Sequence, residues 1–184
     1  MTIRDIEFVG LRSELPQPAQ FSWGAAAHRN VGLVRVRTDD GFEGVGEASV
    51  TFPLWSLEER ALTVREGLRP LAIGQDEDAI PDLIDHLNAT LGRLAPLWSP
   101  TAIQGAIGAF EIALWDIAGK KSGLPLYRLL APDAADPDPV PLYAVGFGGG
   151  PEDMAQGTAA ALAEGYPFVK VRAGFGIERD RALL

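Results

Sequence analysis

Residues 106–131 read AIGAFEIALWDIAGKKSGLPLYRLLA, and this stretch decides how the rest of the chain is interpreted. Its apolar residues recur every three or four positions, which is the spacing of a helix with one buried face. Upstream, Ser99 supplies an N-cap and Pro100 a favoured first helical position, while Gly123 and Pro125 end the pattern. The sequence therefore predicts one long, half-buried helix between these two signals.

The chain before this helix predicts an antiparallel sheet. Residues 3–12 and 31–38 alternate between apolar and polar, and residues 42–49 return as FEGVGEAS after an Asp-Asp-Gly turn. Residues 13–30 contain two prolines and show no period, so we expect a long loop there. The result is an antiparallel meander with one extended connection.

Two more helices are predicted between the sheet and the long helix. Ser56 and Glu59 have the spacing of a capping box, which opens a helix that reaches about Leu71. A second helix is predicted over residues 78–91, with Pro81 tolerated in its first turn. Sheet and helices together indicate an α+β domain.

The pattern changes after residues 131–139, APDAADPDP, which we interpret as a linker. Residues 140–146 predict a short strand, a helix follows from Pro151, and residues 167–174 predict a second strand. A strand–helix–strand unit of this length is typical of parallel pairing. Lys170 and Arg172 are one residue apart in the second strand, so their side chains are expected on one face.

Composition narrows the classes of function. Acidic residues number 25 against 16 basic ones, which gives a formal charge of −9 and disfavours a nucleic-acid partner. The absence of cysteine excludes disulfides and thiolate chemistry. We see neither a signal peptide nor an uninterrupted apolar span, so we expect a cytoplasmic protein with no membrane partner.

The glycine loop after the first strand of this unit raises one alternative, an NADP-binding domain. Gly146 and Gly148 match two glycines of the dinucleotide fingerprint, but Pro151 occupies the place of the third. Arg172 could hold a 2′-phosphate in that arrangement. The broken fingerprint and the preceding meander disfavour this alternative, which stays open.

Residues 106–131 also resemble the signature helix of the mandelate racemase/muconate lactonizing enzyme group within the enolase superfamily. The matching small residues, acids, Gly-Lys pair and Pro-Leu pair are Ala106, Gly108, Ala109, Glu111, Ala113, Leu114, Asp116, Gly119, Lys120, Pro125, Leu126, Leu129, Leu130 and Ala131. Phe110 departs from the pattern, which has an aliphatic residue there. GFEGVGEAS, VPLYA and GYPFVKVRAG resemble the family in order and spacing as well, so the resemblance spans nearly the whole chain.

The resemblance implies an α+β capping domain, residues 1–131, followed by the opening βαβ of a TIM-like (β/α) barrel, residues 132–184. It implies an enzyme that abstracts a proton α to a carboxylate and stabilises the enediolate on Mg²⁺. Lys170 matches the first lysine of the family's Lys-x-Lys strand, and Arg172 replaces the second, which usually acts as the base. Because arginine stays protonated, we expect an acid-sugar dehydratase, with a racemase or cycloisomerase as the alternative.

Substrate recognition in the family comes from two capping-domain loops, which the resemblance places at residues 15–30 and 49–56. The aromatic and charged residues expected to contact the substrate are Phe21, Trp23, His28, Arg29, Phe52 and Trp55. Aromatic side chains on polar loops are costly to expose unless they cover something. The alternative, that they only pin the loops to the capping domain, stays open.

The resemblance places the Mg²⁺ ligands on the third, fourth and fifth barrel strands, and the sequence stops before them. We therefore expect no metal ligand in this chain, and we interpret it as a truncated part, inactive alone, of an enzyme for a small carboxylate. A homo-oligomer is also expected. The alternative from another class is a non-catalytic capping or oligomerisation module.

Overall fold

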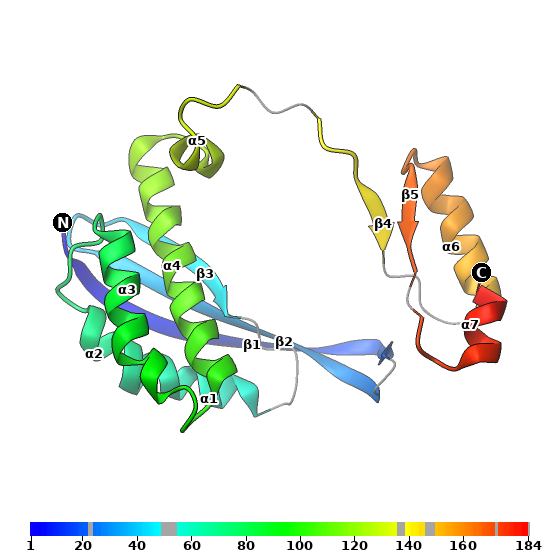
Figure 1. Ribbon diagram of the computed structural model, residues 1–184, viewed down its shortest axis with the longest axis horizontal. Helices are drawn as coiled ribbons and strands as arrows, with labels where there is room; N and C mark the ends of the chain where they lie inside the picture. The colour runs from blue at the N-terminus through cyan, green and yellow to red at the C-terminus, as the bar shows by residue number, and fades with distance from the viewer. Residues whose placement is uncertain (22–23, 49–54, 136–138, 146–149, 172, 184) are drawn as a thin grey trace. The chain divides into compact units, whose positions relative to one another are not determined.

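The computed structural model describes residues 1–21, 24–48, 55–135, 139–145, 150–171 and 173–183. The chain divides into two compact units, Met1–Ser13 with Arg29–Asp133, and Glu14–His28 with Ala134–Leu184. The first unit contains the larger part of a three-stranded sheet with helices beside it, and the second contains the end of the first strand of that sheet, the start of the second strand and a pair of parallel strands (Figure 1). The predicted domains, residues 1–131 and 132–184, stay a prediction.

The three-stranded sheet has the order β1-β2-β3, with β1 at Ile3–Phe21, β2 at Gly24–Thr38 and β3 at Glu43–Ala48. β2 pairs antiparallel with β3, so that Gly32 lies opposite Ala48 and Arg37 opposite Glu43. Alternate residues of β2, including Val34 and Val36, are fully buried. The predicted antiparallel meander is therefore confirmed.

The predicted loop at residues 13–30 is wrong, because β1 continues to Phe21 and β2 begins at Gly24. Pro16 and Pro18 lie within β1, which is an edge strand and so tolerates residues without an N–H donor. Most side chains of this part of β1 are exposed whichever face they occupy. An arm that is exposed on both faces carries no apolar alternation, and the sequence therefore gave no strand signal.

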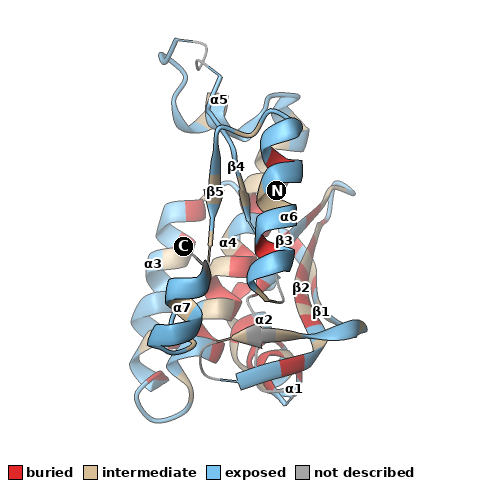
Figure 2. Ribbon diagram, turned by 90° about the vertical axis from the view of Figure 1, so that its right-hand side faces the viewer, coloured by how far each residue is buried: buried red, intermediate tan, exposed pale blue. Residues whose placement is uncertain are grey.

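Helical segments cover one face of this sheet (Figure 1). They are α1 at Ser56–Leu62, the π-helical turn η1 at Thr63–Leu68, α2 at Arg69–Ala72, α3 at Ile80–Thr90, the 3₁₀ turn η2 at Gly92–Leu94 and α4 at Pro100–Ser122. The short α5 at Leu126–Leu130 follows α4 and contacts it. Buried side chains gather where the helices face the strands (Figure 2). No helix of the described residues is long and apolar enough to cross a membrane.

The predicted long helix is confirmed by α4. The Ser99 side chain accepts a hydrogen bond from the Ala102 amide at 3.3 Å, and Gly123 ends the helix with φ 67°. The capping box predicted at Ser56 is wrong. Trp55 is the N-cap residue of α1 and makes no side-chain cap, while the Ser56 hydroxyl is buried without a hydrogen-bond partner among the described residues.

β3 lies directly against α4, and two glycines make this approach possible. A Cβ atom built on Gly44 would lie 2.0 Å from the carbonyl oxygen of Ala113, and one on Gly46 would lie 1.9 Å from that of Ala109. Neither distance leaves room for any side chain. The glycines of FEGVGEAS and the small residues of the signature helix therefore serve one contact inside the first unit.

The second unit contains β4 at Tyr143–Val145, α6 at Pro151–Ala163, β5 at Phe168–Lys170 and α7 at Ile177–Leu183. β4 and β5 pair in parallel, which confirms the predicted strand–helix–strand unit. Asp153 supports the start of α6, because its carboxylate accepts a hydrogen bond from the Gly150 amide at 2.9 Å. The remainder of the glycine loop, residues 146–149, lies outside the described residues.

Candidate active site

Lys170 is the last residue of β5 and lies opposite Val145, the last residue of β4. Residues paired in parallel strands project to the same face, and successive residues alternate between faces. Ala144 and Val169 are half-buried, whereas the residues before and after them in each strand are exposed. This alternation places Lys170 on the more exposed face of the strand pair, at the carboxyl end of both strands, and all three residues of β4 line a groove with residues of α6.

The chain has three lysines, and their electrostatic surroundings differ. Lys120 donates to the Asp116 carboxylate and to the Glu43 carbonyl, both at 2.7 Å. Lys121 donates to Glu77 and is paired with Asp40. In the part of the chain that the structure describes, no hydrogen bond or ion pair involves Lys170.

The charge of Lys121 is stabilised by its neighbours. Burial disfavours the charged form, but hydrogen bonds to Glu77 and Asp40 outweigh burial and raise the pKa of Lys121 above its ordinary value. Glu77 is only 2% exposed, so this pair is a structural element of the first unit. Lys170 has no such partner among the described residues, which distinguishes it from both capping-domain lysines.

The other predicted site residues are placed as follows. Phe21 ends β1 and is half-buried, while His28 and Arg29 lie in β2, half-buried and exposed respectively. Trp55 precedes α1 and is 69% exposed. Arg172, Trp23 and Phe52 lie outside the described residues. The approach of the capping-domain residues to Lys170 stays a prediction.

A Mg²⁺ site needs several oxygen ligands close together. One acidic group, Asp76, Glu77 and Asp78, has potential ligand atoms within 4.8 Å of one another. Two cations already serve it, because Lys121 bonds Glu77 and the amino group of Met1 lies 3.4 Å from Asp76 and 3.5 Å from Glu77. Two of its three carboxylates are therefore engaged by cations of the protein itself, and the group does not fit a catalytic Mg²⁺ site.

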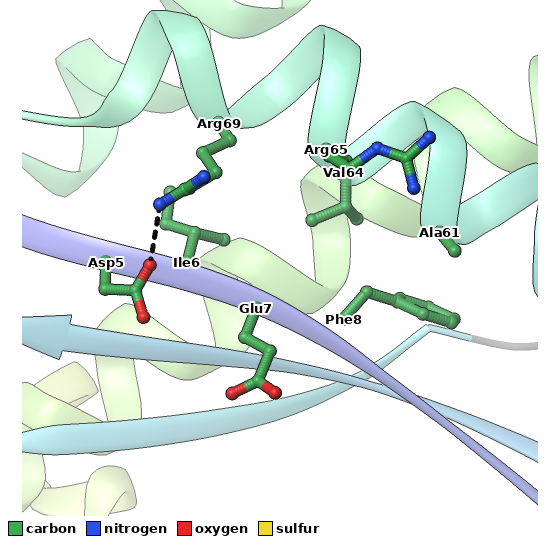
Figure 3. A pocket seen from close by; sticks show the side chains of 8 residues that line it. All are labelled: Asp5, Ile6, Glu7, Phe8, Ala61, Val64, Arg65 and Arg69. Atoms are coloured by element: carbon green, nitrogen blue, oxygen red, sulfur yellow. Dashed lines mark hydrogen bonds and ion pairs between the residues drawn. The ribbon is translucent and has the colours of Figure 1, made fainter.

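A cavity of about 280 Å³ lies between β1 and the helical segments α1, η1 and α2 (Figure 3). Asp5 and Arg69 bridge it with a hydrogen bond of 3.0 Å. Its remaining charges are also paired, since Glu7 bonds Arg35 and Arg65 bonds Glu66. None of the predicted site residues lines this cavity, and its charges offer no free acid, base or nucleophile among the described residues.

The fold defines a class of protein: an α+β capping domain followed by the beginning of a parallel (β/α) barrel. The model of the mandelate racemase/muconate lactonizing enzyme N-terminal domain matches residues 5–131. The chain belongs to the mandelate racemase/muconate lactonizing enzyme family of the enolase superfamily. The predicted family and fold class are thereby confirmed.

Proteins similar to this chain are named after different reactions. A D-galactonate dehydratase family member of Paenibacillus sp. strain JDR-2 is 35% identical over 159 residues, which are 82% of this chain and 36% of that protein. An N-succinyl-L-Arg/Lys racemase of Bacillus cereus is 28% identical over 184 residues, 98% of this chain and 46% of that protein. The crystal structure of an enolase superfamily member from Polaromonas sp. JS666 is similar with a TM-score of 0.82 and 27% identity, covering 100% of this chain and 48% of that one.

The chain spans about a third to a half of the length of these relatives. Their names include dehydratases and a racemase, so relationship to enolase-superfamily enzymes is shown and the individual reaction is not. The Mg²⁺ expectation follows from the family and not from any described residue.

Sequence reasoning missed two features around the lysines. The pair of Lys121 with Glu77 joins residues 44 positions apart, and neither residue belongs to a local motif. The neighbour of Lys170, Val145, could have been found from the sequence by aligning the carboxyl ends of the two strands. Sequence patterns define the ends of short strands only to within a residue or two. An error of one residue in the alignment would have paired Lys170 with a residue on the other face.

Proposed function

We propose that this chain forms the capping domain and first barrel strands of an enzyme that removes the proton α to the carboxylate of a small acid, with dehydration of an acid sugar as its reaction. The observation that carries the proposal is the position of Lys170 at the carboxyl end of a parallel strand, where no described residue pairs with it. Barrel enzymes gather their reacting groups at this end of the strands. The names of the dehydratase relatives support the choice of reaction.

In this proposal the Lys170 ammonium donates hydrogen bonds to the substrate carboxylate. Negative charge grows on that group as the α proton leaves, and a preorganised cation stabilises it more in the transition state than in the ground state. Arg172 lies two residues beyond the end of β5, and it is the second cation that the sequence predicts for this site. A guanidinium is a poor base, so the base is assigned to a residue elsewhere in the complete enzyme.

Racemisation is the second candidate, because the racemase of Bacillus cereus is similar to this chain over 98% of its length. Racemisation needs proton transfer on both sides of the α carbon, and arginine in place of the usual second base weakens that candidate. Mg²⁺ is the cofactor that the family implies. Since the described residues do not fit a site for it, no step is assigned to it here, and a small carboxylate substrate and a homo-oligomer stay predictions.

The test uses the complete chain that contains these residues, incubated with Mg²⁺ and a panel of acid sugars and N-succinyl amino acids. Dehydration is followed by the formation of a 2-keto product, and racemisation by exchange of the α proton in D₂O. Lys170→Ala is expected to lower kcat/KM by about 10³-fold with an unchanged circular dichroism spectrum. Lys120→Ala, which removes a lysine paired in the capping domain, is the matched control and should keep its turnover. Near-native turnover by Lys170→Ala would remove Lys170 from the mechanism.

A further inference from the structure

The register of β4 and β5 brings one more residue to the candidate active site. Val145 lies opposite Lys170 on the neighbouring strand, and both residues end their strands. Neighbouring strands are about 4.8 Å apart, so the Val145 side chain lies beside the first carbons of the lysine stem. Val145 is 54% exposed and shares the more exposed face with Lys170, although it also lines the groove beside α6.

The rest of this face is apolar as well. Tyr143 and Phe168 are paired two residues nearer the amino ends of the strands, and they are 53% and 64% exposed. Two residues of separation along a strand return a side chain to the same face. Lys170 is thus the single charged residue on this face of the two described strands, and the residue at its level is a branched hydrocarbon.

The chemistry of valine suits a particular role at this position. A β-branched side chain has few rotamers and offers a firm surface against which the four-carbon lysine stem can pack. It contains no hydrogen-bond acceptor, so it cannot pair with the ammonium group. The capping domain shows the opposite arrangement, in which the Asp116 carboxylate holds the Lys120 ammonium at 2.7 Å.

We propose that Val145 is a positioning residue for Lys170: it packs against the lysine stem and leaves the ammonium group unpaired and directed beyond the strand ends, toward the carboxylate of a substrate. This rests on the proposed function, because it needs Lys170 to bind that carboxylate. An acid at the same position would instead hold the ammonium group across the strand pair and compete with the substrate.

The test compares Val145→Asp, Val145→Ala and Val145→Ile in the complete chain. Val145→Asp is expected to lower kcat/KM by about 10²-fold, because an acid beside Lys170 competes for its charge. Val145→Ala is expected to raise KM by about fivefold with a smaller change in kcat, since the stem loses its packing surface. Val145→Ile, which keeps the branched hydrocarbon, is expected to stay within about twofold of the unsubstituted enzyme.

A second measurement reports on Lys170 without any turnover. Lysine labelled with ¹³C at Cε gives one NMR signal per lysine, and Lys170→Arg identifies the signal of Lys170. In Val145→Asp this signal is expected to shift at low salt and to move back toward its original position at 1 M NaCl, because salt screens an exposed ion pair. A folded Val145→Asp with an unmoved signal, or with unchanged kcat/KM, would overturn the positioning role.

The two proposals can fail separately. If Lys170→Ala abolishes turnover while Val145→Asp does not affect it, the proposed function stands and the role of Val145 is overturned. If the unsubstituted chain turns over no acid in the panel while the Lys170 signal still responds to Val145→Asp, the proposed function is overturned and the neighbouring placement of the two residues is supported.

Discussion

The antiparallel sheet and the parallel strand pair differ in whether their charged side chains form ion pairs. In the antiparallel sheet, Arg37 bonds Asp5 at 3.0 Å and Glu43 at 2.9 Å, and the apolar side chains of β2 are buried. In the parallel pair, Lys170 has no partner in the described part of the chain and the apolar side chains of its face are exposed. The first region therefore pairs its charges and buries its apolar side chains internally. The parallel strands instead expose a lysine and apolar side chains that a ligand or further parts of a protein could contact.

Removal of core volume is expected to have the largest effect, and only in the first region. Phe110 lies on the buried face of α4 and is fully buried, and Phe110→Ala should lower the free energy of unfolding by about 4 kcal/mol through lost burial and a residual cavity. Urea denaturation measures this change. Ile112→Ala on the same helix is the control, since Ile112 is 52% exposed and should cost less than about 1 kcal/mol. Equal losses from the two variants would contradict the assignment of the buried face.

The contact of β3 with α4 predicts the next largest loss. A Cβ atom on Gly46 would lie 1.9 Å from a backbone oxygen, so Gly46→Ala must push strand and helix apart and should cost about 3 kcal/mol. Gly108→Ala is the matched control, because no atom lies within 4 Å of the new Cβ and alanine favours a helix by about 1 kcal/mol. Thermal unfolding should therefore move in opposite directions for the two substitutions, and a shared direction would argue against the close contact.

This contact also shows what the sequence could and could not predict about the fold. Capping and spacing predicted α4 almost to the residue, because the signals at Ser99 and Gly123 are local. The long arm of the β1–β2 hairpin was missed because an arm exposed on both faces has no apolar period. The capping box at Ser56 failed because its hydroxyl became buried one position inside the helix.

The sequence predicts the position of Lys170 but not its neighbour on the adjacent strand, because only the first depends on a local pattern. The position of Lys170 follows from a strand pattern and from the resemblance of GYPFVKVRAG to the family, both visible in the sequence. Its neighbour Val145 depends on the register between two strands 25 positions apart along the chain, and short apolar strands do not specify register locally. The catalytic and substrate-binding roles that were predicted stay predictions.

The buried ion pair of the first region gives a smaller expected loss than its core. Lys121→Met leaves the Glu77 carboxylate without its lysine, and we expect a loss of about 2 kcal/mol, because the amino group of Met1 at 3.5 Å still compensates part of the charge. Lys120→Met, which removes a half-exposed pair, should cost less than about 1 kcal/mol. Adding Glu77→Leu to Lys121→Met should recover stability in urea denaturation; a further loss would contradict the pairing.

Acid should weaken the same end of the first unit. Hydrogen bonds from Thr38 and then from Lys121 lower the pKa of Asp40 below 3.8, and a hydrogen bond from the Thr2 backbone lowers that of Asp39. A lowered folded-state pKa contributes stability above 3.8 that is lost as the pH falls through the folded value. The free energy of unfolding should therefore decrease below about pH 4, and Asp40→Asn should flatten that decrease. An unchanged profile in Asp40→Asn would assign the acid sensitivity to other carboxylates.

The smallest change in the free energy of unfolding is expected for a substitution of Lys170, and this change distinguishes the two regions most directly. Because no acid pairs with Lys170 in the described residues and its side chain is exposed, Lys170→Met should change the free energy of unfolding by less than about 0.5 kcal/mol. The same substitution at Lys121 removes an ion pair with an acid whose side chain is only 1% exposed. Urea denaturation of the two variants measures the free energy of unfolding that each lysine contributes, and it distinguishes a lysine that stabilises the fold from one that is proposed to bind a ligand. A loss at Lys170 as large as that at Lys121 would mean that an acid of the fold holds it, and the ammonium group would then be unavailable to a substrate.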